Sequence, residues 1–303
     1  MRICSLLPSA TEIAFALGLG DSIVGVTHEC DYPAEARQKP VVVTTFVDPE
    51  KTSGEIDLAI RERLKAGKGV YAIDLPRLRE ASPDLILTQE LCDVCAVDYG
   101  EVVEASRSLP QKPKIISMNP SLLSDVLRDI ELVGNATGKE LEAEAMVASL
   151  RIRIERVREQ ARLADSRPRV ACIEWLEPIY SAGHWMPEMV ELAGGVDGLA
   201  LKGEPSAKVD WEKIVRFAPE VIVLMPCGFE IRRTLRELHL LERLPGWSGL
   251  PAVEDGRLFA VNGPAYFNRS GPRLVDGLEI LAQMIHPEIF PWRAPSDSAQ
   301  RLG

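Results

Sequence analysis

Many side chains that could bind a ligand or a metal follow short apolar runs of this sequence. The runs are residues 23–26, 85–88, 170–175, 221–225 and 258–261. The side chains at or after their ends are His28, Cys30, Tyr32, Gln89, Glu90, Cys92, Cys95, Trp175, His184, Trp185, Cys227, Asn262, Tyr266, Phe267 and Arg269. Loops ordinarily favour Gly, Ser, Asn and Asp, so these sulfur, imidazole and aromatic groups predict a site for a large flat molecule or a metal.

These residue types allow two kinds of chemistry. Aromatic faces can bury a macrocycle, while polar side chains of the same set meet its periphery. Thiolate and imidazole groups are the donors that zinc and iron prefer, and Cys92 and Cys95, with His28 or His184, could hold such an ion. A neutral imidazole from either histidine could also coordinate the metal of a bound chelate.

The apolar runs alternate with segments that carry helical patterns. A candidate helix at 75–81 precedes the run at 85–88, and another at 211–217 precedes the run at 221–225. Such alternation predicts βαβ units and a mainly parallel sheet. Because ligands of open α/β sheets bind at the carboxyl ends of the strands, we expect the candidate side chains to converge there.

The chain also contains an internal repeat. Asp74 stands nine residues before Pro83, and Asp210 stands nine residues before Pro219; an acid and an apolar run follow each proline. Between the two copies, apolar residues recur in steps of three and four from Met146 to Ala164, which indicates one long helix. We therefore predict an α/β fold of two related lobes with mainly parallel sheets: an N-terminal lobe at 1–136, a long interlobe helix at 137–166, and a C-terminal lobe at 167–303 with a Pro-rich tail.

Composition narrows the class of partner. The 303 residues carry a formal net charge of −10, which disfavours nucleic acid and anionic membranes as partners. No apolar run reaches the ~18 residues of a membrane span. The N-terminal stretch is interrupted by Pro8 and Glu12 and is not typical of a signal peptide, so we expect a cytoplasmic protein with free thiols.

Several short motifs in a fixed order resemble one known family. They are Leu7-Pro-Ser-Ala-Thr-Glu12, Asp31-Tyr-Pro33, Pro83-Asp-Leu-Ile, Glu191-Leu-Ala-Gly-Gly195 and Arg269-Ser-Gly-Pro-Arg273. Over residues 1–286 the chain resembles the vitamin B12-binding and iron-siderophore- or haem-binding proteins of ABC importers. The resemblance implies two Rossmann-like lobes joined by a long helix, with the ligand held between them. It is closest to the cobalamin-binding members, through the first 33 residues.

The resemblance also implies roles for individual residues. Tyr32 and Tyr266 match positions whose rings lie against the corrin, and Trp175 and Trp185 fall in equivalent loops. Two carboxylates of the family dock onto arginines of the permease, and the matching positions are Glu212 and, more loosely, Glu101.

The chain departs from the family pattern at three places. No signal peptide is visible, Gln89 stands where an aromatic residue is expected, and residues 53–72 look like an insertion.

Three hypotheses follow. The first is non-catalytic binding of a corrinoid, such as cobalamin, or a related metal chelate in a cleft between the lobes, for uptake, trafficking or storage. An ABC permease is a candidate partner under this hypothesis. The second is a metal-dependent or chelatase-like enzyme with Cys- and His-ligated zinc or iron in the same cleft. The third is a signalling or scaffold protein that has kept the fold and lost the ligand.

Overall fold

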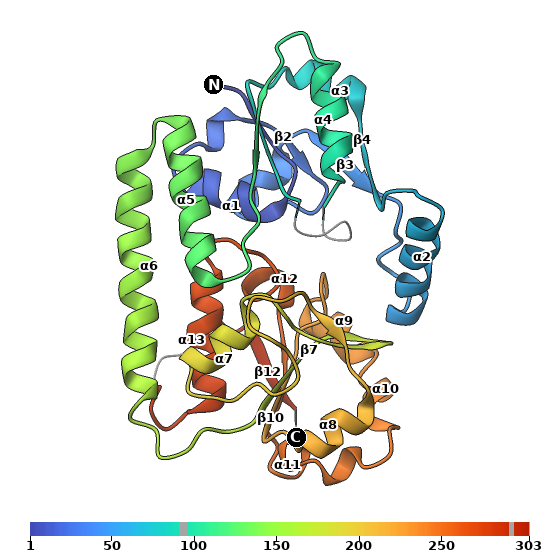
Figure 1. The fold of residues 1–303 in the computed structure, drawn as a ribbon, viewed down its shortest axis with the longest axis vertical. Helices are drawn as coiled ribbons and strands as arrows, with labels where there is room; N and C mark the ends of the chain where they lie inside the picture. Colours follow the sequence, from blue (N-terminus) through green and yellow to red (C-terminus); the bar gives the residue numbers. More distant parts are fainter. Residues whose placement is uncertain (91–95, 291–293, 303) are drawn as a thin grey trace. The chain divides into compact units, whose positions relative to one another are not determined.

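The computed structural model describes residues 1–90, 96–290 and 294–302, and the chain divides into two compact units (Figure 1). Unit 1 comprises residues 1–51, 55–120 and 125–147. Unit 2 comprises residues 52–54, 121–124 and 148–303. The boundary therefore falls inside the long helix, between Val147 and Ala148, and two short segments from the first half of the sequence belong to unit 2.

Unit 1 is built on a sheet with the strand order β4-β3-β2-β1-β5-β6. Every neighbouring pair is parallel except β3 and β4 at one edge. The strands are β1 (Ile3–Ser5), β2 (Ile23–Thr27), β3 (Val41–Thr45), β4 (Tyr71–Ile73), β5 (Leu85–Thr88) and β6 (Lys114–Ser117). The central strands β1 and β5 are fully buried, as expected for a sheet covered by helices on both faces.

Helices connect these strands. They are α1 (Pro8–Ala16), η1 (Gly20–Ser22), η2 (Ala34–Gln38), α2 (Ser53–Lys65), α3 (Leu75–Ala81), α4 (Tyr99–Arg107) and α5 (Leu123–Thr137). Helix α1 starts at Pro8, because the fixed φ of proline suits the first helical position. The core of the unit packs Leu6 and Ile86 of the sheet region against Leu78 of α3 and Val102 of α4.

Unit 2 has the strand order β12-β11-β10-β7-β8-β9. Its centre, β11-β10-β7, is parallel, and its two edges are antiparallel. The strands are β7 (Val170–Leu176), β8 (Ile179–Ser181), β9 (Ala207–Lys208), β10 (Val221–Leu224), β11 (Leu258–Val261) and β12 (Ala299–Leu302). The structure thus confirms the predicted α/β class with two sheets that are mostly parallel when taken together. In unit 2 the edge strands β8, β9 and β12, which were not predicted, add three antiparallel pairs around the parallel centre.

The remaining helices follow the same alternation. They are α6 (Glu140–Ala161), α7 (Met186–Leu192), α8 (Trp211–Phe217), α9 (Ile231–Arg236), α10 (His239–Glu242), η3 (Trp247–Gly249), α11 (Pro251–Glu254), α12 (Gly263–Tyr266) and α13 (Leu274–Ile285). No helix in the described part of the chain has both the length and the apolar character that crossing a bilayer demands.

The internal repeat is structural. Helix α3 follows Asp74 and α8 follows Asp210, and each ends at a residue in the left-handed conformation, Ser82 or Ala218, both with φ of 47°. A proline and a buried strand come next in both copies, β5 or β10. The two copies therefore deliver equivalent strands to the centres of the two sheets.

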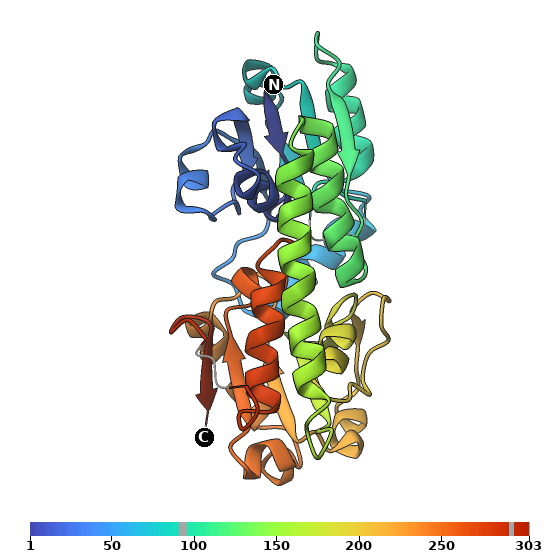
Figure 2. The same ribbon diagram turned by 90° about the vertical axis from the view of Figure 1, so that its left-hand side faces the viewer.

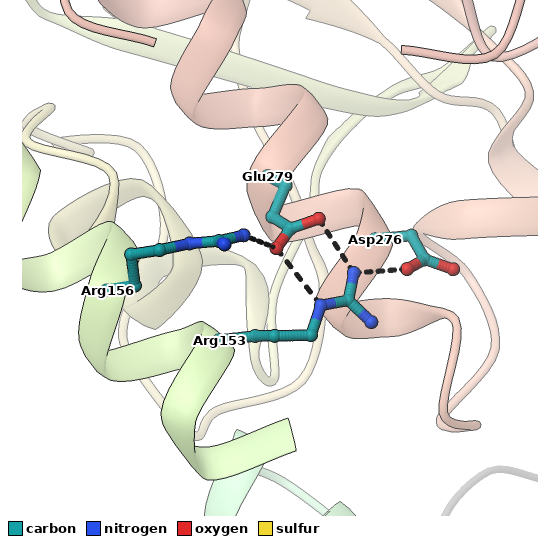
Figure 3. A network of polar contacts seen from close by, with 4 residues as sticks. All are labelled: Arg153, Arg156, Asp276 and Glu279. Atoms are coloured by element: carbon teal, nitrogen blue, oxygen red, sulfur yellow. Dashed lines mark hydrogen bonds and ion pairs between the residues drawn. The ribbon is translucent and has the colours of Figure 1, made fainter. Parts of the chain in front are cut away.

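The long helix α6 is fixed within unit 2 by a polar network with α13, which runs beside its second half (Figure 2). Arg153 donates from Nε to Glu279 Oε1 at 3.0 Å and from Nη2 to Glu279 Oε2 at 2.7 Å, and it also reaches Asp276. Arg156 Nη2 donates to the same Glu279 Oε1 at 2.8 Å (Figure 3). Only 15% of the Glu279 side chain is exposed, so solvent screens these pairs less than it screens surface pairs.

Two glutamates pair with arginines of α6, and the network predicts that replacing each by alanine changes the free energy of unfolding by a different amount. Glu279→Ala leaves the half-buried Arg153 without its bidentate partner and should lower the free energy of unfolding by about 1–3 kcal/mol. Glu155→Ala removes an exposed pair with Arg158 and should change it by less than about 0.5 kcal/mol. Urea unfolding measures both, and equal effects of the two variants would contradict a supporting role for the network.

Candidate functional site

The carboxyl end of β1 in unit 1 carries a buried chain of hydroxyl and thiol groups. Thr11 Oγ1 donates to Ser5 Oγ at 2.8 Å and lies 3.0 Å from Cys30 Sγ. The Cys30 thiol also lies 3.7 Å from Thr27 Oγ1, and only 4% of the residue is exposed. Cys30 therefore ties the end of β2 to the start of α1, and its sulfur faces protein rather than solvent.

The other predicted residues of unit 1 differ in exposure. His28 donates its backbone N–H to Val43 O at 3.0 Å, and 29% of its side chain is exposed. Tyr32 is 46% exposed, whereas Gln89, at the end of β5, is 8% exposed. Glu90 is exposed and donates its backbone N–H to Asn119 Oδ1 at 2.6 Å. The rings of His28 and Tyr32 are thus more accessible than the side chains of Cys30 and Gln89.

In unit 2, Trp175 and Cys227 lie where β7 and β10 end. The Cys227 backbone N–H donates to Glu174 O at 3.1 Å, and its thiol is free and partly exposed. The Trp175 ring is half-buried against Phe229, with ring centroids 5.1 Å apart. The two neighbouring parallel strands therefore bring these side chains to one edge, as the sequence predicted.

A second group forms around the start of α7 and α12. Trp185 donates its indole N–H to Phe267 O at 2.9 Å, and the two residues are 8% and 1% exposed. Asn262 caps α12 by accepting the Ala265 backbone N–H at 3.2 Å. In this structure Trp185 and Phe267 therefore pack the unit and Asn262 ends a loop.

Tyr266 and Arg269 complete this group and are both half-buried. The Arg273 guanidinium lies 5.8 Å from the centroid of the Tyr266 ring. Tyr266 thus retains accessible ring surface that Trp185 and Phe267 lack.

The backbone around His184 is clasped by the segment 203–206. His184 donates its N–H to Glu204 O at 2.6 Å, and its own carbonyl accepts the Gly203 N–H at 2.9 Å. His184 has φ of 50°, a left-handed conformation that costs a non-glycine residue about 1–2 kcal/mol. Such strain persists only where surrounding contacts impose it, and it is concentrated at functional sites.

Glu174 and Ser206 add side-chain hydrogen bonds next to this clasp. Ser206 Oγ accepts the Gly183 N–H at 3.0 Å and donates to Glu174 Oε2. Burial raises the pKa of Glu174, and the hydrogen bond from Ser206 offsets only part of this rise. The sequence analysis missed both residues, although a carboxylate inside the apolar run of β7 was a usable signal.

Three buried polar atoms at the strand ends have no hydrogen-bond partner among the described residues. They are Thr88 Oγ1 in unit 1 and His184 Nε2 and Asn268 Oδ1 in unit 2. Buried polar atoms are nearly always paired, so each of these atoms calls for a partner from outside the described residues, such as a bound water or a ligand. Burial also lowers the pKa of His184, which keeps its imidazole neutral and able to donate a lone pair to a metal.

The described residues contain no cluster that supports the predicted protein-bound metal. Cys92 and Cys95 lie outside the described residues. Within the described ranges, no group of three or more His, Cys, Asp and Glu side chains is placed to hold a metal ion.

The two predicted docking carboxylates occupy matching places in the two units. Glu101 and Glu212 are both exposed and lie in the first turns of α4 and α8, after Asp98 and Asp210. Glu101 borders a groove of about 590 Å³ that Phe46 and Tyr71 also line. Partial burial and the neighbouring Asp98 raise the pKa of Glu101.

Comparison with known proteins decides the family. The sequence profile of the periplasmic binding protein family matches residues 3–264. The chain belongs to this family. An uncharacterized ABC transporter substrate-binding lipoprotein of Bacillus subtilis is 28% identical over 300 residues, which cover 95% of this chain and 81% of that protein.

Two further relatives illustrate the range of the family. The vitamin B12-binding protein of Vibrio cholerae is 26% identical over 283 residues, 92% of this chain and 86% of that protein. The solved structure of a periplasmic haem-binding protein from Roseiflexus has the same fold, with a TM-score of 0.72 at 20% identity, covering 94% of this chain and 98% of that one.

These relatives correct the expected location. The prediction of a cytoplasmic protein is wrong, since the relatives are periplasmic proteins or lipoproteins of ABC importers. That prediction rested on the lack of a visible leader. The N-terminal stretch forms β1 and α1 of the folded unit, and elements of a folded domain do not report the compartment of the protein. The enzyme hypothesis finds no support in the family either.

The clasp around His184 predicts that Gly183 cannot be replaced. A Cβ there would lie 2.4 Å from Ser206 N and 2.5 Å from Glu204 O, both backbone atoms. Gly183→Ala should therefore lower the free energy of unfolding by about 2 kcal/mol or more. Gly249→Ala, where a Cβ meets nothing within 4 Å, should cause no loss. Urea unfolding followed by Trp fluorescence compares the two, and equal midpoints would show that the clasp is loose.

Proposed function

We propose that this chain is the substrate-binding protein of an ABC importer and binds a corrinoid or a related metallated macrocycle without chemical change. The proposal is supported by the curated relatives, among which the vitamin B12-binding protein of Vibrio cholerae matches 92% of this chain. The observation that carries it within the chain is His184, which has a left-handed backbone and a buried Nε2 with no hydrogen-bond partner among the described residues.

His184 suits an axial donor to the metal of such a chelate. Its backbone is fixed on both sides by the 203–206 segment, so the side chain starts from a defined position. Its ring lies 5.7 Å from that of Trp185, tilted by 33°. Because no hydrogen bond from the described residues restrains Nε2, the imidazole breaks none of these when it turns outward toward a ligand. Tyr266, half-buried at the same end of the sheet, offers ring surface to a macrocycle.

Ligands with and without a free axial position test this role. Hydroxocobalamin has an exchangeable axial ligand, whereas the cyanide of cyanocobalamin is held tightly. His184→Gln should weaken hydroxocobalamin binding by roughly tenfold or more, because losing about 1.4 kcal/mol already changes the affinity tenfold. Cyanocobalamin binding should change much less. Titration followed by absorbance measures both affinities, and the lowered pKa of His184 predicts that the shifted band persists below the ordinary histidine pKa of about 6.5.

The matched control is His239→Gln, which changes an exposed histidine of α10. Equal affinities of the two variants for hydroxocobalamin would remove His184 from the site. Haem and a ferric siderophore are tested in parallel on the unaltered chain. If the unaltered chain bound neither cobalamin, nor haem, nor the siderophore, the proposed function itself would be contradicted.

We also propose that Glu101 and Glu212 bind arginines of the permease. Both carboxylates are exposed at helix starts, and the raised pKa of Glu101 means that a cationic partner would stabilise its charged form. Glu101→Arg combined with Glu212→Arg should abolish co-purification of the permease from membranes of the source organism. Glu144→Arg with Glu254→Arg makes the same change in net charge at two other exposed sites and should leave it intact. Retention of the permease by the first double variant would exclude this docking mode.

A further inference from the structure

The tripeptide Thr52–Gly54 is separated in sequence from the rest of unit 2 but belongs to it. Its central residue, Ser53, is completely buried. The Ser53 N–H donates to both carboxylate oxygens of Glu237, at 3.1 and 3.0 Å. The Ser53 carbonyl accepts the indole N–H of Trp175 at 3.2 Å. Both backbone polar groups of Ser53 are therefore satisfied by side chains more than 100 residues away in the sequence.

The side chains that hold Ser53 form a closed ring of contacts. Glu237 is 4% exposed and pairs with Arg233 Nη2 at 2.6 Å. The Arg233 guanidinium lies 4.1 Å from the centroid of the Phe229 ring, and that ring packs against Trp175 with centroids 5.1 Å apart. Trp175 then returns to Ser53 through its indole N–H.

This ring explains how a carboxylate can be buried at this position. An ionised carboxylate taken out of water needs charge-assisted partners. Within unit 2, Glu237 has the Arg233 guanidinium and the Ser53 N–H as partners. These two contacts hold the tripeptide against the side chain of Glu237.

The tripeptide lies against the carboxyl end of β7, where a ligand of this sheet is expected. A Cβ on Gly54 would come within 2.7 Å of Glu177 Oε2, so the segment is packed closely onto the residues that follow the strand. It occupies the indole edge of Trp175, one of the aromatic side chains at that end.

We propose that Thr52–Gly54, anchored by Glu237, is a built-in strap that determines which macrocycles can reach Trp175. The inference rests on the proposed function and adds a specificity determinant to it. The strap takes space and hydrogen-bonding capacity from the ligand at the end of β7. Loosening it should favour the bulkier of two related ligands.

Glu237→Gln tests the strap at two levels. The variant keeps the shape of the side chain but loses the charge that pairs with Arg233. Amide hydrogen exchange of residues 52–54, followed by mass spectrometry without ligand, should become about tenfold faster. The ratio of affinities for hydroxocobalamin and the smaller cobinamide should shift by roughly fivefold or more toward hydroxocobalamin.

Glu188→Gln is the matched control, because Glu188 also accepts a backbone N–H at a helix start, that of Leu123 at 2.8 Å. It should alter neither the exchange of residues 52–54 nor the affinity ratio. Trp175→Phe removes the other hydrogen bond of the strap, from the indole N–H to Ser53 O. For this variant only the amide hydrogen exchange is measured. It should also speed exchange of residues 52–54.

Unchanged exchange at 52–54 in both Glu237→Gln and Trp175→Phe would overturn the anchoring. Faster exchange with an unchanged affinity ratio would overturn the role in specificity. If the unaltered chain binds neither corrinoid, the specificity role falls with the proposed function, and the exchange measurement still decides whether the strap is anchored.

Discussion

Parallel strand pairing is the constraint on which the candidate site depends. In unit 1, Ile3–Ser5 pairs with Leu85–Leu87, and in unit 2, Val221–Leu224 pairs with Val170–Ile173. Parallel partners end at the same edge of a sheet, so residues far apart in sequence are brought together without direct contact between their loops. The grouping of Trp175 with Cys227 follows from the pairing of β7 with β10, which the hydrogen bond from Cys227 N–H to Glu174 O extends past the paired residues.

Hydrogen bonds also fix the backbone of two segments near the strand ends. The His184 loop is fixed by the 203–206 segment and by Ser206 on Glu174, and the Ser53 segment is fixed by Glu237. Both arrangements bury a carboxylate that has polar partners. The strand ends are thus preorganised, which lowers the entropy that a ligand must remove on binding. The helix pair α6 and α13 gives unit 2 a rigid side through the Arg153 and Glu279 network (Figure 3).

The sequence predicted elements whose pattern is local. The repeat at Asp74 and Asp210, the buried parallel strands and the long helix all follow from short-range patterns. The helix predicted at 137–166 is observed at Glu140–Ala161. The edge strands β8 and β9 were missed because two or three residues carry too little periodicity. The burial of Trp185 and Phe267 was also beyond the sequence, since a ring can either pack a loop or face a ligand and only tertiary contacts decide between them.

The most direct test of the account is a crystal structure of the chain grown with hydroxocobalamin. The account predicts corrin density at the carboxyl ends of β7 and β10, in contact with Tyr266, with the His184 imidazole turned outward and bonded to the cobalt. A corrin bound away from these strand ends, with Nε2 of His184 still enclosed by protein, would contradict it.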